Sequence, residues 1–226
     1  MKTILHVSCS PRGKAAESHR LSQEIIRALQ ARLPGSSVIE RVIGDGSLPH
    51  IDNDYALSQS SLQDVSREGT MAVSEVLVRE LEGADYLVIG TPMHNLTVPA
   101  SLKAWLDHVV RARRTFTIGA GGKVGMLCNR PVYVAVASGG RFSGEQARQP
   151  DFLTPYLTTI LGTIGLHDLT YFSVQGTGAS PQCVATTRTQ ASVEIKEHFA
   201  SLLEKSSEKR LNQPSYATVT ELIREV

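Results

Sequence analysis

The sequence contains little cysteine and no excess of charge of either sign. Its three cysteines, Cys9, Cys128 and Cys183, are far apart in a chain of 226 residues and include no CxxC pair. They therefore indicate neither a disulfide framework nor a zinc site. The 23 Lys and Arg residues nearly balance the 22 Asp and Glu residues, which leaves a net charge of +1. Because nucleic acids and membrane surfaces usually attract a basic excess, we expect neither as a partner.

Long hydrophobic runs are also absent. The longest, such as residues 132–137, have the length of a strand and fall far short of the ~18 apolar residues of a membrane span. Residues 1–8 lack the longer apolar core and the cleavage site of a signal peptide. Hydrophobic residues make up 41% of the chain, which is too many for a disordered protein with so little net charge. We therefore expect a folded, cytoplasmic protein.

Short apolar segments alternate with amphipathic segments along the chain. The apolar segments predict strands over residues 4–7, 38–43, 86–90, 132–137 and 169–174. The amphipathic segments predict helices over residues 18–33, 71–83, 100–113, 152–164 and 184–203, with a long functional loop at 44–69. Buried strands that alternate with helices predict a parallel sheet covered on both faces. The expected fold is α/β, a flavodoxin-like doubly wound five-stranded sheet with strand order 2-1-3-4-5.

All of these elements fit one domain over residues 1–203. We predict that residues 204–226 form a C-terminal linker and a short tail, because residues 204–210 are charged and polar throughout. Within the tail, residues 216–226 are expected to form a short helix with Val219, Leu222, Ile223 and Val226 on one side. Such a tail would dock on its own domain or on a partner subunit.

In an open parallel sheet of this order, ligands bind at the carboxyl ends of the strands where the order reverses. Three unusual loops, residues 8–18, 91–99 and 137–145, are expected to meet there. The first offers the hydroxyls of Ser10 and Ser18 and the free N–H groups of the helix that follows, an arrangement that favours a phosphate. The same residues also fit a loop without a ligand, in which Ser18 only caps the helix.

This first loop does not match other phosphate-binding motifs. It has neither the G-x-G-x-x-G of a dinucleotide-binding turn nor the GK[ST] of a P-loop. A phosphatase cradle built on Cys9 would need arginine at position 15, which is Ala15. In the second loop, Asn95 and nearby backbone amides lie beside the crevice, and in the third, two glycines allow close approach of the main chain. Together the loops suit a mononucleotide, with its phosphate on the first and its planar ring between the others.

Several segments resemble one known family in the same order along the chain. Residues 92–96, PMHNL, resemble the P-M-Y-N-F motif of the FMN-dependent NADH azoreductases, a branch of the flavodoxin-like NAD(P)H:quinone oxidoreductases. The other matching segments are residues 102–107, 111–112, 115–116, 138–140, 154–157 and 161–165. The resemblance covers roughly residues 3–203, and it is specific because no single short motif carries it.

This resemblance implies an enzyme with non-covalent FMN, NADH or NADPH as electron donor, and quinones or azo compounds as acceptors. It also implies a homodimer with a flavin at each subunit interface. The residues that would surround the phosphate by position are Ser10, Ala16, Glu17 and Ser18. The residues that would contact the flavin ring are Met93, His94, Asn95, Leu96, Ala137, Ser138, Gly139 and Gly140. Phe116 would belong to the substrate pocket, and we expect a ping-pong mechanism of hydride transfer.

The chain departs from the family's pattern beside both the phosphate and the ring. The family's S-x-S is Ala16-Glu17-Ser18 here, so one hydroxyl is lost, and Glu17 would repel a phosphate unless its side chain points away. The family's Tyr and Phe are His94 and Leu96. His94 is a candidate proton donor to the acceptor, because imidazole titrates near neutral pH. The simpler interpretation is that His94 only packs against the ring.

Two other functions stay open from the sequence. One is a flavodoxin-type electron carrier, although such carriers are typically shorter and acidic. The other is a non-catalytic flavin-binding module in which the tail from Asn212 onward is the working part. We expect no metal site, because the spacing of Asp45, His50, Asp52 and Asp54 fits no metal motif.

Overall fold

The computed structural model describes residues 1–60 and 68–211. A five-stranded parallel sheet forms its centre, with strand order β2-β1-β3-β6-β7. The strands are β1 (Thr3–Ser8), β2 (Ser37–Val42), β3 (Tyr86–Pro92), β6 (Pro131–Ser138) and β7 (Asp168–Gln175). When only the strands of this sheet are counted, the order is the predicted 2-1-3-4-5, so the predicted fold is confirmed.

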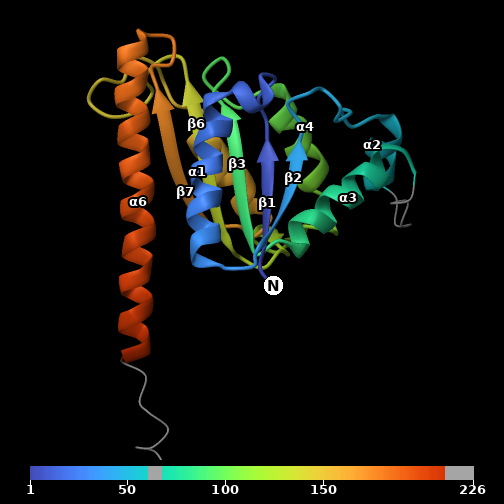
Figure 1. The fold of residues 1–226 in the computed structure, drawn as a ribbon. Helices are drawn as coiled ribbons and strands as arrows, with labels where there is room; N and C mark the ends of the chain where they lie inside the picture. Colours follow the sequence, from blue (N-terminus) through green and yellow to red (C-terminus); the bar gives the residue numbers. More distant parts are fainter. Residues whose placement is uncertain (61–67, 212–226) are drawn as a thin grey trace, which may run out of the picture.

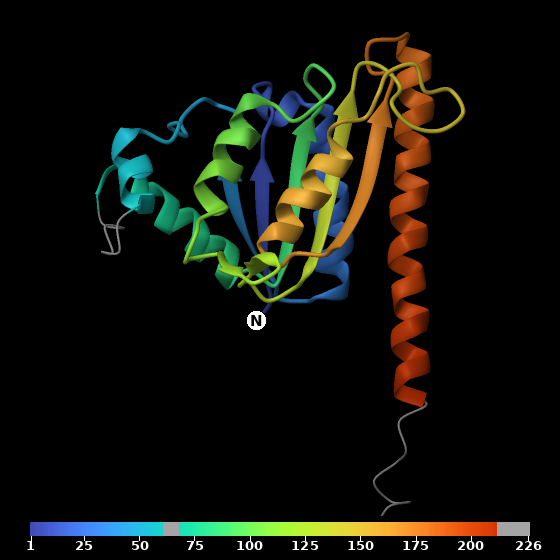
Figure 2. The same ribbon diagram turned by 180° about the vertical axis from the view of Figure 1, so that it is seen from behind.

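Helices cover both faces of this sheet (Figures 1 and 2). One face carries α1 (Glu17–Arg32) and α6 (Pro181–Leu211), and the other carries α3 (Gly69–Gly83), α4 (Ala100–Val109) and α5 (Thr154–Thr163). Successive strand residues alternate between the two cores, so that Leu87 and Ile89 face α3, α4 and α5 whereas Val88 faces α1 and α6. This double burial explains why the strand segments are apolar at nearly every position.

The strand ends bring the three expected loops together. Pairing of β1 with β3 continues past the strands, where the Cys9 N–H donates to Gly90 O at 2.9 Å. Pairing of β3 with β6 reaches Pro92 and Ala137, and the Met93 N–H then donates to Ala137 O at 2.8 Å. The chain therefore leaves the sheet at neighbouring positions after each of these strands.

Two elements were not predicted. α2 (Asn53–Ser60) lies within the segment expected to be a loop, and Tyr55 anchors it by donating a hydrogen bond to Asp107 O at 3.0 Å. β4 (Phe116–Gly119) and β5 (Gly122–Gly125) form an antiparallel hairpin in a segment for which no strand was predicted. Most side chains of these three elements are exposed, so their sequences carry little of the hydrophobic periodicity on which the predictions depend.

Two helices end at positions other than those predicted. α4 stops at Val109 because the Thr115 hydroxyl donates to Val109 O at 2.6 Å and accepts from the Arg111 N–H at 2.9 Å. α6 runs on to Leu211 through residues expected to form a linker, and it extends well beyond the sheet (Figure 1). Residues 204–210 contain neither Gly nor Pro, so nothing in them ends a helix. The predicted tail helix at 216–226 lies outside the described residues.

Within the described residues, no helix is both long enough and apolar enough to cross a membrane. This includes α6, which has 31 residues.

The side chain of Arg130 binds the C-terminal end of α3 and is expected to stabilise the fold. Its guanidinium donates to the backbone oxygens of Leu81 at 2.6 Å and Glu82 at 3.2 Å, and also to that of Ala84, where α3 ends without helical partners for its carbonyls. We expect Arg130→Ala to lower the free energy of unfolding by about 1–3 kcal/mol, because these carbonyls lose their donor. Urea denaturation measures the change.

The matched control is Arg148→Ala, an exposed arginine bonded to the adjacent Ala147 O, which should change stability by less than about 0.5 kcal/mol. Equal losses in both variants would contradict the prediction.

Candidate functional site

A cavity of about 210 Å³ opens at the carboxyl ends of the central strands. Its lining residues come from the loops after β1, β3, β6 and β7, and they are Ser10, Pro11, Arg12, Ala16, Glu17, Ser18, Pro92, Met93, His94, Ala137, Gly139 and Thr177. The cavity lies where the strand order reverses between β1 and β3, the position that the topology predicts for a ligand. All three loops identified in the sequence therefore border one cavity.

The loop after β1 is shaped by its own backbone. Gly13 has a φ of +52° and begins the short 3-10 helix η1 (Gly13–Ala15). The Gly13 N–H donates to Ser10 O at 3.0 Å, and the Arg12 N–H donates to the Ser10 hydroxyl at 3.3 Å. These bonds fold the chain back before α1, so that Ser10, Arg12 and the start of that helix border the same cavity.

The N-terminus of α1 has unsatisfied donors. Ala16 is the N-cap residue, and no side chain of residues 1–60 or 68–211 caps the helix, so its first N–H groups lack a capping acceptor there. The Ser18 hydroxyl is buried, lines the cavity and has no hydrogen-bond partner in the described part of the chain. The interpretation in which Ser18 caps the helix is therefore wrong. Since an unpartnered buried hydroxyl is unfavourable, this end of α1 is suited to a bound anion that accepts hydrogen bonds.

Glu17 does not present a free negative charge to the cavity. Its carboxylate accepts hydrogen bonds from Arg188 Nε at 2.9 Å and from Arg20 Nε at 3.2 Å. The Arg188 guanidinium, with help from Arg20, holds the pKa of Glu17 below its usual range even though partial burial opposes the shift. The sequence raised the concern that Glu17 would repel a phosphate, and the pairing with Arg188 of α6 and with Arg20 offsets its charge.

The loop after β3 is a tight turn with an unusual backbone. The His94 N–H donates to Thr97 O at 2.9 Å, and the Thr97 N–H donates to His94 O at 3.0 Å. Between them, Asn95 and Leu96 have φ values of 47° and 73°, a left-handed conformation that is rare for leucine. Backbone strain of this kind is common at binding sites, where surrounding contacts hold it in place. The turn leaves His94 exposed at the edge of the cavity.

The two glycines after β6 have different roles. A Cβ atom added to Gly139 would have no heavy atom within 4 Å, so the main chain there borders open space. A Cβ atom added to Gly140 would lie 2.3 Å from Gln149 Oε1. Gln149 in turn donates to the Ser138 hydroxyl and to Met93 Sδ, both at 3.1 Å. Gly139 therefore leaves room for a ligand, whereas Gly140 leaves room for a side chain that joins two of the loops.

Eight of the twelve predicted cofactor-binding residues line the cavity: Ser10, Ala16, Glu17, Ser18, Met93, His94, Ala137 and Gly139. Asn95, Leu96, Ser138 and Gly140 do not line it but shape the loops around it. Phe116 does not line it either. Phe116 is buried in the hydrophobic core at the start of β4, beyond the far end of α4, with Lys123 Nζ 4.8 Å from its ring centroid.

Four lining residues were not predicted to bind the cofactor, namely Pro11, Arg12, Pro92 and Thr177, and Phe152 contacts the turn after β3 without lining the cavity. Thr177 follows β7, and both its N–H and its hydroxyl donate to Ser138 O, at 2.9 and 3.1 Å. Phe152 is 57% exposed, and its N–H donates to Leu96 O at 3.1 Å. The position of Thr177 could have been inferred, because every parallel strand delivers its following loop to the same edge of the sheet. No sequence signal marks Phe152, which reaches the turn from the segment before α5.

A larger cavity, of about 640 Å³, lies between β7, α5 and the segment that precedes α5. Its polar side chains already bond to one another or to the backbone. Tyr171 contacts the Thr158 hydroxyl at 2.9 Å and donates to Thr154 O at 3.0 Å, and Gln175 Nε2 donates to the Ser143 hydroxyl at 2.6 Å. Since these groups are satisfied within the protein, the smaller cavity is the stronger candidate site.

Residues set aside from the sequence have structural roles. Cys9 is buried, and burial raises the pKa of its thiol, so that it is not a reactive thiolate. Asp45 accepts hydrogen bonds from the N–H and the hydroxyl of Ser47, at 3.0 and 2.7 Å. Asp52 accepts from the Tyr55 N–H at 2.8 Å at the start of α2. These two carboxylates therefore stabilise a turn and a helix start.

Relatives of known description match nearly the whole chain. A model of the flavodoxin-like fold family matches residues 2–199. A curated relative from Pseudomonas fluorescens, described as an FMN-dependent NADH:quinone oxidoreductase, is 44% identical over 191 residues, which are 84% of this chain and 92% of the relative. A relative of the same description from Burkholderia lata is 42% identical over 190 residues, which are 84% of this chain and 93% of the relative.

Solved structures show the same fold at lower identity. An azoreductase from Bacillus anthracis has a TM-score of 0.76 at 23% identity and covers 88% of this chain and 99% of its own. An FMN-dependent NADH-azoreductase from the same species, crystallised with FMN, has a TM-score of 0.72 at 22% identity and covers 89% and 99%. The family match over residues 2–199 and the two curated relatives above 40% identity establish that the chain belongs to the flavodoxin-like fold family, among the FMN-dependent NADH:quinone oxidoreductases.

Proposed function

We propose that this chain is an FMN-dependent oxidoreductase that transfers two electrons, as hydride, from NADH or NADPH to quinones and azo compounds. Non-covalently bound FMN would supply the two-electron redox chemistry, while the protein supplies binding and orientation. One observation carries the proposal: among the described residues, the Ser18 hydroxyl has no partner, and it is buried at the uncapped start of α1, inside a cavity at the strand-order reversal. This combination of donors fits the phosphate of a mononucleotide.

The cavity suggests how the rest of the cofactor would be held. Ser10, Ser18 and Arg12 would bind the phosphate end, and the flat ring would lie between the turn at Met93 and the open main chain at Gly139. Backbone N–H groups near Gly139 and Gly140 would stabilise negative charge on the reduced ring. The residues that line the cavity include no cysteine and no cluster of carboxylates, in keeping with chemistry that the cofactor supplies.

The small volume of the cavity supports a site that the electron donor and the acceptor occupy in turn and that a second copy of the chain completes. At about 210 Å³ it is smaller than the ~300–1,000 Å³ of pockets that enclose most of a ligand. One face of the ring would therefore stay open, and NAD(P)H and the acceptor would occupy it in turn, as a ping-pong mechanism requires. A second copy of the chain would complete the site in a homodimer, by covering the open side of the cavity.

The cysteines support the proposal of a cytoplasmic location. None of the three forms a disulfide, and Cys128 and Cys183 are exposed as free thiols. Exposed free thiols persist in a reducing compartment.

An absorbance spectrum of the purified full-length chain tests the function. We expect a yellow protein whose flavin absorbance is lost when NADH is added without oxygen and returns when a quinone follows. Initial rates at several fixed quinone concentrations should give parallel double-reciprocal lines, the signature of a ping-pong mechanism. Reduction by NADH without a protein partner separates the enzyme from an electron carrier, and turnover separates it from a flavin-binding module. A colourless chain that takes up no FMN from solution would overturn the proposal.

The Ser18 hydroxyl can be tested by comparing FMN with riboflavin, which lacks the phosphate. We expect Ser18→Ala to weaken FMN binding about 10- to 100-fold, the effect of removing a hydrogen bond to a charged group, and to leave riboflavin binding unchanged. Quenching of flavin fluorescence measures both affinities. Ser36→Ala is the matched control, because its hydroxyl is also buried without a partner but lies beyond the other end of α1. If Ser18→Ala weakened both ligands equally, Ser18 would not bind the phosphate.

His94 can be assigned by the pH dependence of turnover. Because its side chain is exposed on the turn that borders the cavity, we expect it to contact the ring and not to donate a proton. His94→Phe should then retain quinone reduction with the parent's pH profile of the oxidative half-reaction, as measured by stopped-flow oxidation of the reduced enzyme. His94→Gln, which keeps a hydrogen-bonding group that does not titrate, serves as the control. Loss of the same pH-dependent limb in both variants would instead identify His94 as the proton donor.

A further inference from the structure

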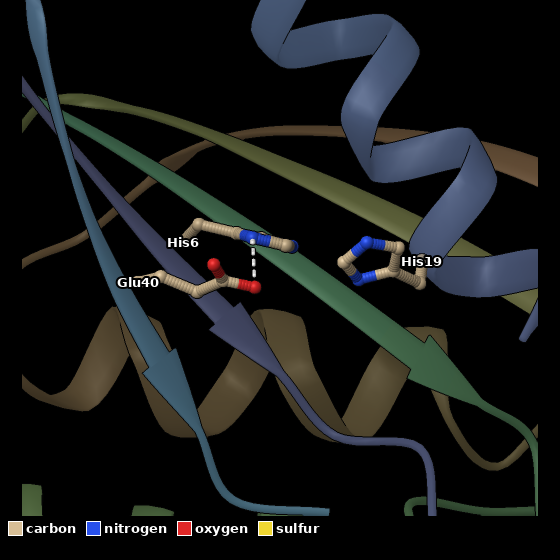
Figure 3. A group of neighbouring side chains, drawn as sticks. All are labelled: His6, His19 and Glu40. Atoms are coloured by element: carbon tan, nitrogen blue, oxygen red, sulfur yellow. Dashed lines mark ion pairs between the residues drawn. The ribbon is translucent and has the colours of Figure 1, made fainter. Parts of the chain in front are cut away.

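Three side chains, from β1, β2 and the first turn of α1, lie close together at a place that does not border the cavity (Figure 3). His6 belongs to β1, His19 to the first turn of α1, and Glu40 to β2. One nitrogen atom of each histidine and one carboxylate oxygen of Glu40 all lie within 4.8 Å of one another. His6 and Glu40 are paired in the register of two neighbouring strands, so both side chains emerge on the face that α1 covers.

Hydrogen bonds determine which nitrogen of His6 faces this cluster. The Ser22 hydroxyl donates its single proton to His19 O at 2.9 Å, so at 2.8 Å it can only accept a hydrogen bond from His6 Nε2. In the neutral ring, Nδ1 then carries the lone pair. That atom lies 4.0 Å from Glu40 Oε1 and 3.5 Å from the amide nitrogen of Gln23. A partner that fixes the tautomer and direction of a histidine is a regular feature of protein metal sites.

The distances suit a small cation between the three side chains. Zinc binds histidine nitrogen at ~2.0–2.1 Å and carboxylate oxygen at ~2.0–2.2 Å, so ligand atoms in a tetrahedral site lie about 3.4 Å apart. The ligand atoms therefore need to move closer together by at most about 1.4 Å. His6 is fully buried, whereas the Glu40 side chain is 44% exposed on the edge strand and can move. That exposure also gives an ion access from solvent and leaves room for water as a fourth ligand.

We propose that His6, His19 and Glu40 form a binding site for a divalent transition-metal ion of the zinc type. Two imidazoles and one carboxylate match the preference of zinc and its neighbours for nitrogen ligands, and they are a poor set for magnesium or calcium, which prefer oxygen. The ion ties the first turn of α1 to β1 and β2. This site does not depend on the proposed redox function, and it differs from the sequence-based expectation of no metal because its ligands follow no motif spacing.

Metal binding is tested on the full chain after chelation and dialysis. The exposed thiols of Cys128 and Cys183 also bind zinc, so the parent protein for this experiment is Cys128→Ser/Cys183→Ser. Calorimetric titration should show one Zn²⁺ per chain, and Zn²⁺ should raise the melting temperature, since an ion that binds only the folded state stabilises it. Co²⁺ should give the strong visible absorption of a tetrahedral site.

Variants of the two accessible ligands decide the assignment. Glu40→Gln and His19→Gln should each weaken Zn²⁺ binding at least tenfold and remove the rise in melting temperature. The matched controls, Glu145→Gln and His167→Gln, change exposed residues elsewhere and should bind Zn²⁺ as the parent does. Far-ultraviolet circular dichroism checks that each variant is folded, and His6 is left unchanged because it is buried in the core. Absence of saturable binding at one ion per chain, an octahedral Co²⁺ spectrum, or ligand variants that bind as tightly as the controls would overturn the proposal.

Discussion

Close contact between α1 and the central strand β3 positions the side chains of both proposed binding sites. A Cβ atom added to Gly90 would lie 2.9 Å from the Ser22 hydroxyl and 3.1 Å from Ser18 O, so glycine is required for the helix to lie this near the sheet. Because successive residues of a helix point about 100° apart, consecutive side chains of its first turn reach different surroundings. Ser18 borders the cavity, whereas His19 joins His6 and Glu40. One helix placement thus serves both the proposed cofactor site and the proposed metal site.

The long helix α6 contacts α1 along its length and helps to hold its first turn in place. Arg188 binds the Glu17 carboxylate at the start of α1, Ser192 donates to Glu24 at 2.8 Å, and the backbone oxygen of Phe199 accepts from Arg32 near the end of α1. These contacts run along α1 from its first residue to its last. The contact at Glu17 bears on the cavity. Without Arg188, the charge of the Glu17 carboxylate would repel a phosphate bound at the adjacent N–H groups. Helix α6 therefore also neutralises the one carboxylate beside the proposed phosphate site.

Sequence patterns predicted the sheet and the edge of it at which the loops meet, because both follow from burial. Strands buried on two faces must be apolar at nearly every position, and helices that cover them must be amphipathic, so β1, β3 and β6 and their loops were correctly expected. The same logic fails for exposed elements. α2 and the β4–β5 hairpin expose most of their side chains, and α6 continues through residues 204–210, whose sequence is charged and polar throughout. Phe116 was assigned by resemblance alone, and in this chain it packs in the core away from the cavity.

Within the site, what the sequence does not reveal is which polar atoms remain unpaired after folding. Ser10 and Ser18 are both buried serines in the same loop, and composition treats them alike. The Ser10 hydroxyl accepts a hydrogen bond from the Arg12 N–H, whereas the Ser18 hydroxyl has no partner in the described residues. Likewise, His6 and Glu40 are distant in sequence and are brought together only by the parallel pairing of β1 with β2. In both places, tertiary neighbours decide whether a side chain can bind a ligand. A hydroxyl is left without a partner, or two metal-binding side chains face each other, only after the surrounding structure has folded.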